Sequence, residues 1–250
     1  MIYMFVFIYG AQIMHGVIEE KSSRVVEVLI SSVRPFQLMM GKVLGIASVG
    51  LVQLLIWVIL VGVVYSAVLG FFGISGPQDG VMGQVMQNVP DSAGTNAGMQ
   101  KVADIMGGIP FGKIIFTFIF YFIGGYLMYG ALFAAVGSAV DSQAEAQQFM
   151  FPITIPMIVA LIALSTIILQ DPDSSTSFWF SIIPLTSPIA MMGRIAFEVP
   201  AWEMALSMVM LVGGFVFTIW IASRVYRVGI LLHGTKVNFK VLVKWFFMKG

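Results

Sequence analysis

Two adjacent carboxylates followed by an arginine, Glu19-Glu20-x-x-x-Arg24, are the residues whose types and spacing best suit bond-making chemistry. Paired carboxylates beside a histidine can activate water as general acid and base. The two histidines are His15, before the motif, and His233, in the C-terminal region, and neither is well placed to complete such a site. With no cysteine and only two histidines, thiolate chemistry and a histidine-rich metal site are excluded. We therefore predict no catalytic residue, metal or cofactor.

The same motif opens an amphipathic stretch, residues 19–34, that ends before Pro35, because the residue preceding a proline disfavours the helical conformation. At about 100° per residue, its polar and apolar side chains fall on opposite faces. Such a helix either floats in the lipid headgroups or docks against a cytosolic partner protein. The charged side chains on the polar face are the candidate partner contacts: Glu20, Arg24, Glu27 and Arg34.

Two further charged residues, Arg194 and Glu198, are spaced for an ion pair on a short helix, because residues four apart share a helix face. A contact with substrate is the alternative role for this pair. ATP binding is not expected, because the chain lacks a Gly-x-x-x-x-Gly-Lys-Ser/Thr phosphate loop and Gly41-Lys42 has no upstream glycine at the required spacing. We expect no enzyme activity in this chain, and ATP must bind to another subunit.

Hydrophobic residues make up 59% of the 250 residues and charged residues only 10%, against roughly 25% charged in an ordinary soluble domain. Lipid must therefore be the solvent for most of the chain. The apolar runs are continuous, which predicts helices and not barrel strands. Runs long enough to span are residues 1–18, 43–72, 113–140, 151–169 and 204–222. The predicted fold class is an all-α integral membrane protein, a single transmembrane domain over residues 1–250 with five transmembrane helices and amphipathic cytoplasmic helices.

A sixth apolar stretch, Phe178–Gly193, is short and is interrupted by Pro184 and Pro188. We predict a re-entrant hairpin at residues 178–198, which lipid tolerates only where protein shields the backbone. This hairpin would enter and leave the membrane on the same side, so it does not change the orientation of the segments that follow.

Glycines and mildly polar side chains inside the apolar runs predict contacts between helices. Glycine lets two helix backbones approach closely, and the candidates are Gly41, Gly45, Gly124, Gly125, Gly130 and Gly137. Polar side chains within spans either form hydrogen bonds between helices or bind substrate. The candidates of this kind are Gln12, Gln53, Thr117, Tyr121, Tyr126 and Tyr129.

Basic residues predict the orientation, because cytoplasmic segments are enriched in lysine and arginine. Ten of the 13 basic residues fall in residues 19–42 and 223–250, which places both segments in the cytoplasm. Five spans of a cell inner or plasma membrane then put the N-terminus outside and the C-terminus inside. The tail 223–250 carries lysines at steps of four beside aromatic residues, which predicts an interfacial anchor that binds membrane lipid and no nucleic acid.

One run in the polar segment is specific in sequence: Glu20-Lys21-Ser22-Ser23-Arg24-Val25-Val26-Glu27-Val28-Leu29. It is followed by Gln37-Leu38 and Gly41-Lys42, and later by Ile183-Pro184-Leu185-Thr186-Ser187-Pro188, Arg194, Tyr226-Arg227-Val228-Gly229-Ile230-Leu231 and Gly234. Together these residues resemble the type-2 ABC exporter permeases, above all their NatB-like branch. The resemblance covers nearly the whole chain.

The resemblance implies that residues 19–34 form a coupling helix in a groove of an ABC ATPase (nucleotide-binding) subunit. It also implies a short hairpin near the outer leaflet, and a second permease copy or homologue with the transport path between the two halves. Such permeases begin with one more span and a large extracellular domain. We therefore expect this chain to lack both, either as a fragment of a longer permease or because the permease is split or its start is wrongly placed.

Three alternatives stay open at the level of sequence. The Glu-Glu-x-x-x-Arg motif is shared with CAAX-type intramembrane proteases, but those enzymes also carry histidines on later membrane helices. A secondary transporter keeps ionisable groups inside the membrane, whereas Glu203 lies only at the edge of a predicted span. The third alternative is a membrane anchor or scaffold subunit.

The charge distribution makes a testable prediction of topology. Cysteines introduced at Ser22 and Thr235 should be shielded from an impermeant thiol reagent in intact cells, and a cysteine at Ser92 should react. The chain has no native cysteine, so the labelling has no background from the protein itself. Labelling at Thr235 together with protection at Ser92 would reverse the predicted orientation.

Overall fold

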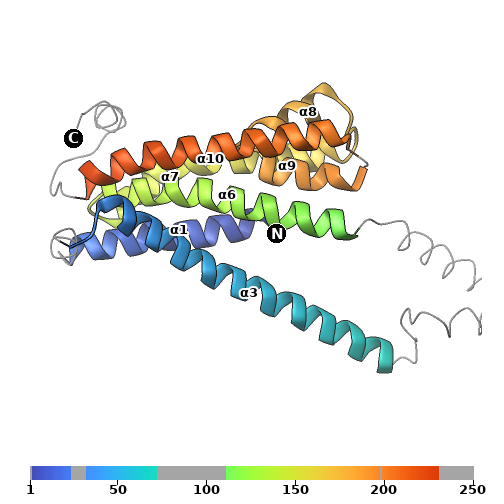
Figure 1. Cartoon of the computed structure of the whole chain (residues 1–250), viewed down its shortest axis with the longest axis horizontal. Coiled ribbons are helices and arrows are strands. Elements are labelled where there is room, and N and C mark those ends of the chain that lie inside the picture. The colour runs from blue at the N-terminus through green and yellow to red at the C-terminus, as the bar shows by residue number, and fades with distance from the viewer. Residues whose placement is uncertain (1, 24–31, 72–110, 198, 231–250) are drawn as a thin grey trace, which may run out of the picture. The chain divides into compact units, whose positions relative to one another are not determined.

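The computed structural model describes residues 2–23, 32–71, 111–197 and 199–230, and most of these residues lie in helices (Figure 1). The long helices are α1 (Ile2–Ser22), α3 (Pro35–Phe71), α6 (Phe111–Ala139), α7 (Gln143–Ala163) and α10 (Ala201–Gly229). The short elements are the π-helical turn η1 (Leu164–Ile168), α8 (Ser175–Ile182), α9 (Ser187–Arg194) and the 3-10 turn η2 (Ile195–Phe197). No strand occurs within these described ranges.

Five stretches within the described ranges are long and apolar enough to cross a membrane. They are Ile2–Ser22, Pro35–Val64, Lys113–Ala139, Gln143–Ile168 and Ala201–Gly229. The predicted all-α integral membrane fold is thereby confirmed. The helices generally continue past the predicted spans, because hydropathy marks the edge of the hydrocarbon and not the end of the helix. At the start of α7, for example, the Glu145 amide donates to the Ser142 hydroxyl in an N-cap 3.3 Å long.

Contact between residues divides the chain into two compact units. One unit holds Met1–Gly50 and Ile114–Gly250, and the other holds Leu51–Lys113. The single helix α3 begins in the first unit and continues into the second. All the polar contacts described below lie in the first unit.

Helix α6 is the most deeply buried of the apolar helices, and glycines are the reason that its neighbours come so close. A Cβ at Gly137 would lie 2.7 Å from the Met14 carbonyl oxygen of α1, and one at Gly125 would lie 2.9 Å from Pro188 of α9. Gly124 and Gly130 are similarly close to Leu211 and Ile13. Close packing at these four predicted glycines is confirmed.

At Gly41 and Gly45 of α3, the described residues provide no such close contact. No atom of the described residues lies within 4 Å of a Cβ placed at either position. The Gly-x-x-x-Gly spacing therefore does not mark a helix contact within the described part of this chain, although it is the usual sign of one.

The first unit has two polar ends. We call one the lysine end, where α1 ends at Ser22, α3 begins at Pro35 and α6 passes into α7. We call the other the hairpin end, where α8 and α9 pack on η1 and on the first half of α10 (Figure 1). Gly193 of α9 lies directly against Leu164 of η1, and Gly214 of α10 lies directly against Pro184 between α8 and α9.

Replacing Gly137 by alanine should destabilise the fold, because the new Cβ meets the backbone of α1, which cannot rotate away. Overpacking of this kind costs about 1–3 kcal/mol. The matched control is Gly213→Ala in α10, where nothing described lies within 4 Å of the added Cβ. We expect a lower thermal unfolding midpoint in detergent for Gly137→Ala and an unchanged or higher one for the control. Equal midpoints for both variants would contradict this packing.

Candidate functional site

A buried lysine organises the lysine end. Lys21 lies in the last turn of α1 with 1% of its side chain exposed. Its ammonium donates to the Ser138 carbonyl at 2.9 Å and to the Val140 carbonyl at 3.4 Å, and it forms an ion pair with Asp141 at 2.9 Å. These acceptors belong to the end of α6 and to the turn that leads into α7. Lys21 therefore joins the last turn of α1 to the point where α6 becomes α7.

The position of this ammonium satisfies two electrostatic requirements at once. The last carbonyls of a helix lack intrahelical donors, and the negative end of the helix dipole favours a cation there. A buried ammonium, in turn, needs hydrogen-bond acceptors and an opposite charge to offset its lost hydration. Gly229 of α10 brings a third helix to the same place, since its Cβ would lie 2.9 Å from the Ser138 carbonyl oxygen.

A second ion pair closes the segment that connects α1 with α3. Glu20 pairs with Lys42 at 2.7 Å, and the Lys42 ammonium runs past Gly16, where a Cβ would lie 3.2 Å from it. Glu20 is the residue before Lys21, and Lys42 lies in the first turns of α3. This ion pair therefore holds the end of α1 against the start of α3.

The predicted partner contacts fall at the two ends of this segment and between them. Glu20 is held by Lys42, and Arg34 is exposed immediately before Pro35, the first residue of α3. The backbone N–H of Arg34 donates to the Gln37 side chain at 3.3 Å, as in one half of a capping box. Arg24 and Glu27 lie outside the described residues.

Residue spacing did not predict the ion pairs of Lys21 and Lys42. Their partners are remote or not spaced for one helix face. The hydrogen-bonded residues Lys21 and Ser138 are separated by 117 positions. A lysine in the last turn of a mostly apolar spanning helix, as Lys21 is in α1, is the signal that points to such a partner.

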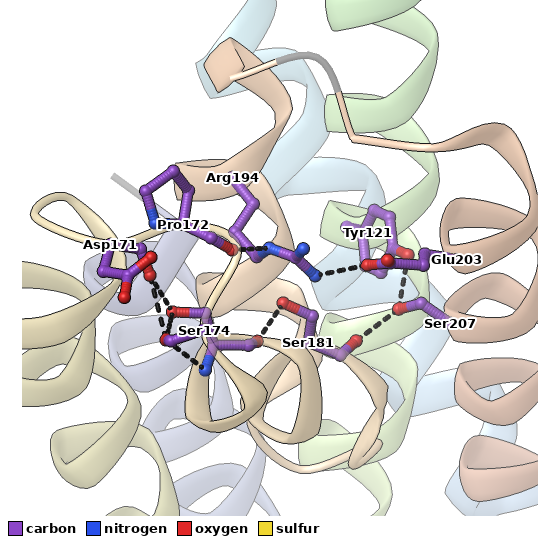
Figure 2. Close-up of polar contacts among 9 residues, drawn as sticks. Tyr121, Asp171, Pro172, Ser174, Ser181, Arg194, Glu203 and Ser207 are labelled. Carbon is purple, nitrogen blue, oxygen red and sulfur yellow. Dashed lines mark hydrogen bonds and ion pairs between the residues drawn. The ribbon is translucent and has the colours of Figure 1, made fainter.

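Another buried cation lies at the hairpin end, as Figure 2 shows. Arg194, with 2% of its side chain exposed, forms an ion pair with Glu203 at 2.8 Å, and its Nε donates to the Pro172 carbonyl at 2.8 Å. The arginine ends α9 and Glu203 lies in the first turn of α10, so the pair ties the hairpin to α10. Glu198, the partner predicted from spacing, lies outside the described residues, so that pairing stays a prediction.

Hydroxyl groups continue this network through the hairpin (Figure 2). Tyr121 of α6 donates to Ser207 of α10 at 2.6 Å, and Ser207 donates to the Ser181 carbonyl of α8. Ser181 then donates to the Ser177 carbonyl at 2.7 Å, and Ser177 donates to the Asp171 carbonyl at 2.7 Å. The bonds connect α6, α10 and α8 where each is otherwise apolar.

Each of the three tyrosines predicted to make polar contacts inside the spans forms a hydrogen bond to another element. Besides the Tyr121 bond, Tyr126 donates to the Val43 carbonyl of α3 at 3.0 Å, and Tyr129 donates to the Leu185 carbonyl between α8 and α9. Thr117 makes a weaker contact, 3.9 Å from the Met204 sulfur of α10. These side chains hold helices together, as polar groups in lipid must.

The polar residues at the lysine end and at the hairpin end are better suited to holding helices in place than to catalysing a reaction. Lys21 and Arg194 are each bonded to a carboxylate and to backbone carbonyls. The lysine end presents a segment fixed at its two ends, and the hairpin end holds two short helices against α10. Such an arrangement can transmit a displacement from one helix to its neighbours.

Comparison with known proteins identifies the family of the chain. The family described as ABC-2 family transporter protein matches residues 1–224. The chain is 30% identical over 242 residues to the uncharacterised protein YhaP of Bacillus subtilis, covering 96% of this chain and 52% of that protein. It is 25% identical over 253 residues to the uncharacterised protein MJ1024 of Methanocaldococcus jannaschii, covering 100% of this chain and 52% of that protein. The chain thus spans about half the length of these relatives. No solved structure gives a significant match.

Substituting Lys21 by methionine should destabilise the lysine end, because hydrogen bonds to a charged donor are lost and the α6 carbonyls keep no replacement. The loss should be about 1.5–3 kcal/mol. The comparison variant is Lys42→Met, whose partner Glu20 is 31% exposed and can rehydrate, so a smaller loss is expected. Denaturant unfolding in detergent measures both. A Lys21→Met protein as stable as the native chain would contradict the anchoring role.

Proposed function

Because the chain belongs to the ABC-2 transporter family, we propose that it is the membrane-spanning permease subunit of an ATP-driven exporter whose ATPase is a separate subunit. One observation carries the coupling part of this proposal. The residues at the two ends of the segment, Glu20 and Lys42, are held together by an ion pair 2.7 Å long. A segment fixed at both ends is suited to receive force from a partner and to pass it to the helices.

The four predicted coupling residues then divide into two roles. We assign contact with the ATPase to Arg24, Glu27 and Arg34, and positioning of the segment to Glu20. Arg34 is exposed and so accessible to a partner, whereas Glu20 is held by Lys42. In a groove of an ATPase subunit, these charges would be desolvated against opposite charges, where each pair matters more than at an open surface.

The path from this segment into the bundle runs through Lys21. Since Lys21 follows Glu20 directly and binds the end of α6, a displacement of the segment acts on α6 and on the start of α7. In the proposed cycle, ATP hydrolysis in the partner moves the segment and the spans repack to open outward. Transport takes place between this chain and a second permease copy or homologue.

The proposed orientation places the lysine end in the cytoplasm, where ATP is available and where basic residues accumulate. The N-terminus is then outside the cell inner or plasma membrane and the C-terminus inside. Membership of the NatB-like branch stays a prediction from the sequence motif. The activity belongs to the assembled transporter, since the chain covers 52% of each relative.

The geometry does not favour the protease alternative. A general base must reach water and its substrate, but Glu20 is engaged by Lys42 at 2.7 Å. His15 lies on α1 itself and not on a later membrane helix. The Glu-Glu-x-x-x-Arg motif of this chain is better explained as the start of the coupling segment, the residues between Glu20 and Lys42.

Charge reversal in the segment tests the proposal. Arg24→Glu and Glu27→Lys should each abolish co-purification of the ABC ATPase subunit from detergent-solubilised membranes, because disrupting one charge of a desolvated pair costs about 2–5 kcal/mol of association. A helix that only rests on the membrane would tolerate either change, since exposed pairs are worth about 0–1 kcal/mol. Lys101→Glu, on the opposite side in the predicted topology, is the matched control.

The amount of each variant in the membrane is measured in parallel, so that loss of ATPase is not confused with failed insertion. Undiminished recovery of the ATPase with both variants would contradict the coupling role. It would favour an anchor subunit or a secondary transporter.

A further inference from the structure

Helix α8 exposes a large apolar side chain while two of its serines are buried. Ser177 and Ser181 are 0% exposed and bond within the protein, whereas Trp179 is 60% exposed and Ile183, just after the helix, is 43% exposed. A helix of a water-soluble protein turns its apolar stripe inward. An outward tryptophan and isoleucine above inward serines indicate that lipid surrounds this side of the hairpin.

The hairpin also reaches far along α10. At its start, the Phe178 ring lies 5.9 Å from the ring of Trp202, in the first turn of α10. At its tip, Pro184 lies against Gly214 of the same helix. The distance from Trp202 to Gly214 along an α-helix is about 18 Å, at 1.5 Å per residue. This is more than half of a hydrocarbon core about 30 Å thick.

Polarity changes along the hairpin in the order expected for a membrane boundary. The connection before α8 carries the exposed residues Asp171 and Asp173, and α8 begins with the exposed Ser175 and Thr176. Aromatic rings follow within one turn. Apolar residues form the tip around Pro184. From the connection before α8 to the tip at Pro184, the chain would therefore pass from water through the interface into the hydrocarbon.

We propose that Phe178, Trp179 and Trp202 form an aromatic anchor in the lipid–water interface at the hairpin end, with the hairpin tip below them in the hydrocarbon. Phe178 lies between the two tryptophans, with ring centroids 5.7 Å and 5.9 Å from theirs. Both tryptophans are 60% exposed. Tryptophan is enriched at this depth, because its ring is apolar while its N–H seeks a polar partner.

The opposite interface is marked on α10 by a second tryptophan. Trp220 lies under the Arg224 guanidinium, 4.4 Å from the ring centroid. From Trp202 to Trp220 the helix rises about 27 Å, which is close to the thickness of the hydrocarbon core, about 30 Å. The two aromatic levels thus bracket one bilayer. This inference requires neither an ATPase partner nor a direction of transport.

Quenching by brominated lipids tests the depth of the anchor. Two variants each keep one native tryptophan, either Trp179 or Trp202, and carry phenylalanine at the other four positions. They are reconstituted in phosphatidylcholine brominated either near the headgroup or near the chain end. We expect stronger quenching by the shallow bromines in both variants.

A third variant supplies the internal reference for depth. It carries Val212→Trp as its sole tryptophan, on the exposed side of α10 and about 15 Å along the helix from Trp202. Deep bromines should quench this residue more strongly than shallow ones. If a single-tryptophan variant fails to fold, Trp179→Phe in the otherwise native chain replaces it. That substitution should lower the ratio of shallow to deep quenching.

Two results would overturn the proposal. Trp179 quenched more strongly by deep bromines would place α8 in the hydrocarbon and not at the interface. Trp179 quenched by neither lipid, while Val212→Trp is quenched, would mean that water or another protein covers the ring.

Discussion

The arrangement of the lysine end depends on one buried ammonium. Lys21 is 1% exposed and would be very unfavourable there without acceptors. The carbonyls of Ser138 and Val140 and the carboxylate of Asp141 supply them. The same bonds satisfy carbonyls at the end of α6, so the ammonium and the helix end stabilise each other. This mutual dependence fixes α1 against α6 at the point where the coupling segment begins.

Lipid as solvent explains why polar groups elsewhere point inward. In water, a serine or tyrosine hydroxyl is satisfied at the surface, but in hydrocarbon it must find a partner within the protein. Tyr121, Ser207 and Ser181 therefore bond to one another between helices. The exposed positions of the same helices are filled by residues such as Val209 and Phe217 of α10, which lipid solvates well.

The sequence predicts what is local and leaves open what is remote. Long apolar runs predicted the spanning helices, because length and hydropathy are properties of a single segment. Spacing alone did not identify the partner of Arg194, since Glu203 lies on the next helix and comes close only after the hairpin folds. Glycine patterns were informative on α6, where neighbours approach from several sides, whereas no described residue comes as close to Gly41 and Gly45. A pattern shows that close approach is allowed, whereas the fold decides whether a neighbour is present.

Helix α7 connects the lysine end with the hairpin end, and its backbone hydrogen bonding is interrupted along the way. It begins two residues after Asp141, with Ser142 as its cap, and it ends in η1, where Leu164 packs on Gly193 of α9. Between these fixed ends lie Pro152 and Pro156, and a proline removes a helical hydrogen bond and crowds the preceding turn. A π-helical turn then widens the hydrogen-bond ladder. The ends of α7 are therefore held by ion pairs and close packing, while its interior has the weaker backbone bonding. Bending in this helix should be concentrated between the two clusters and not within either of them.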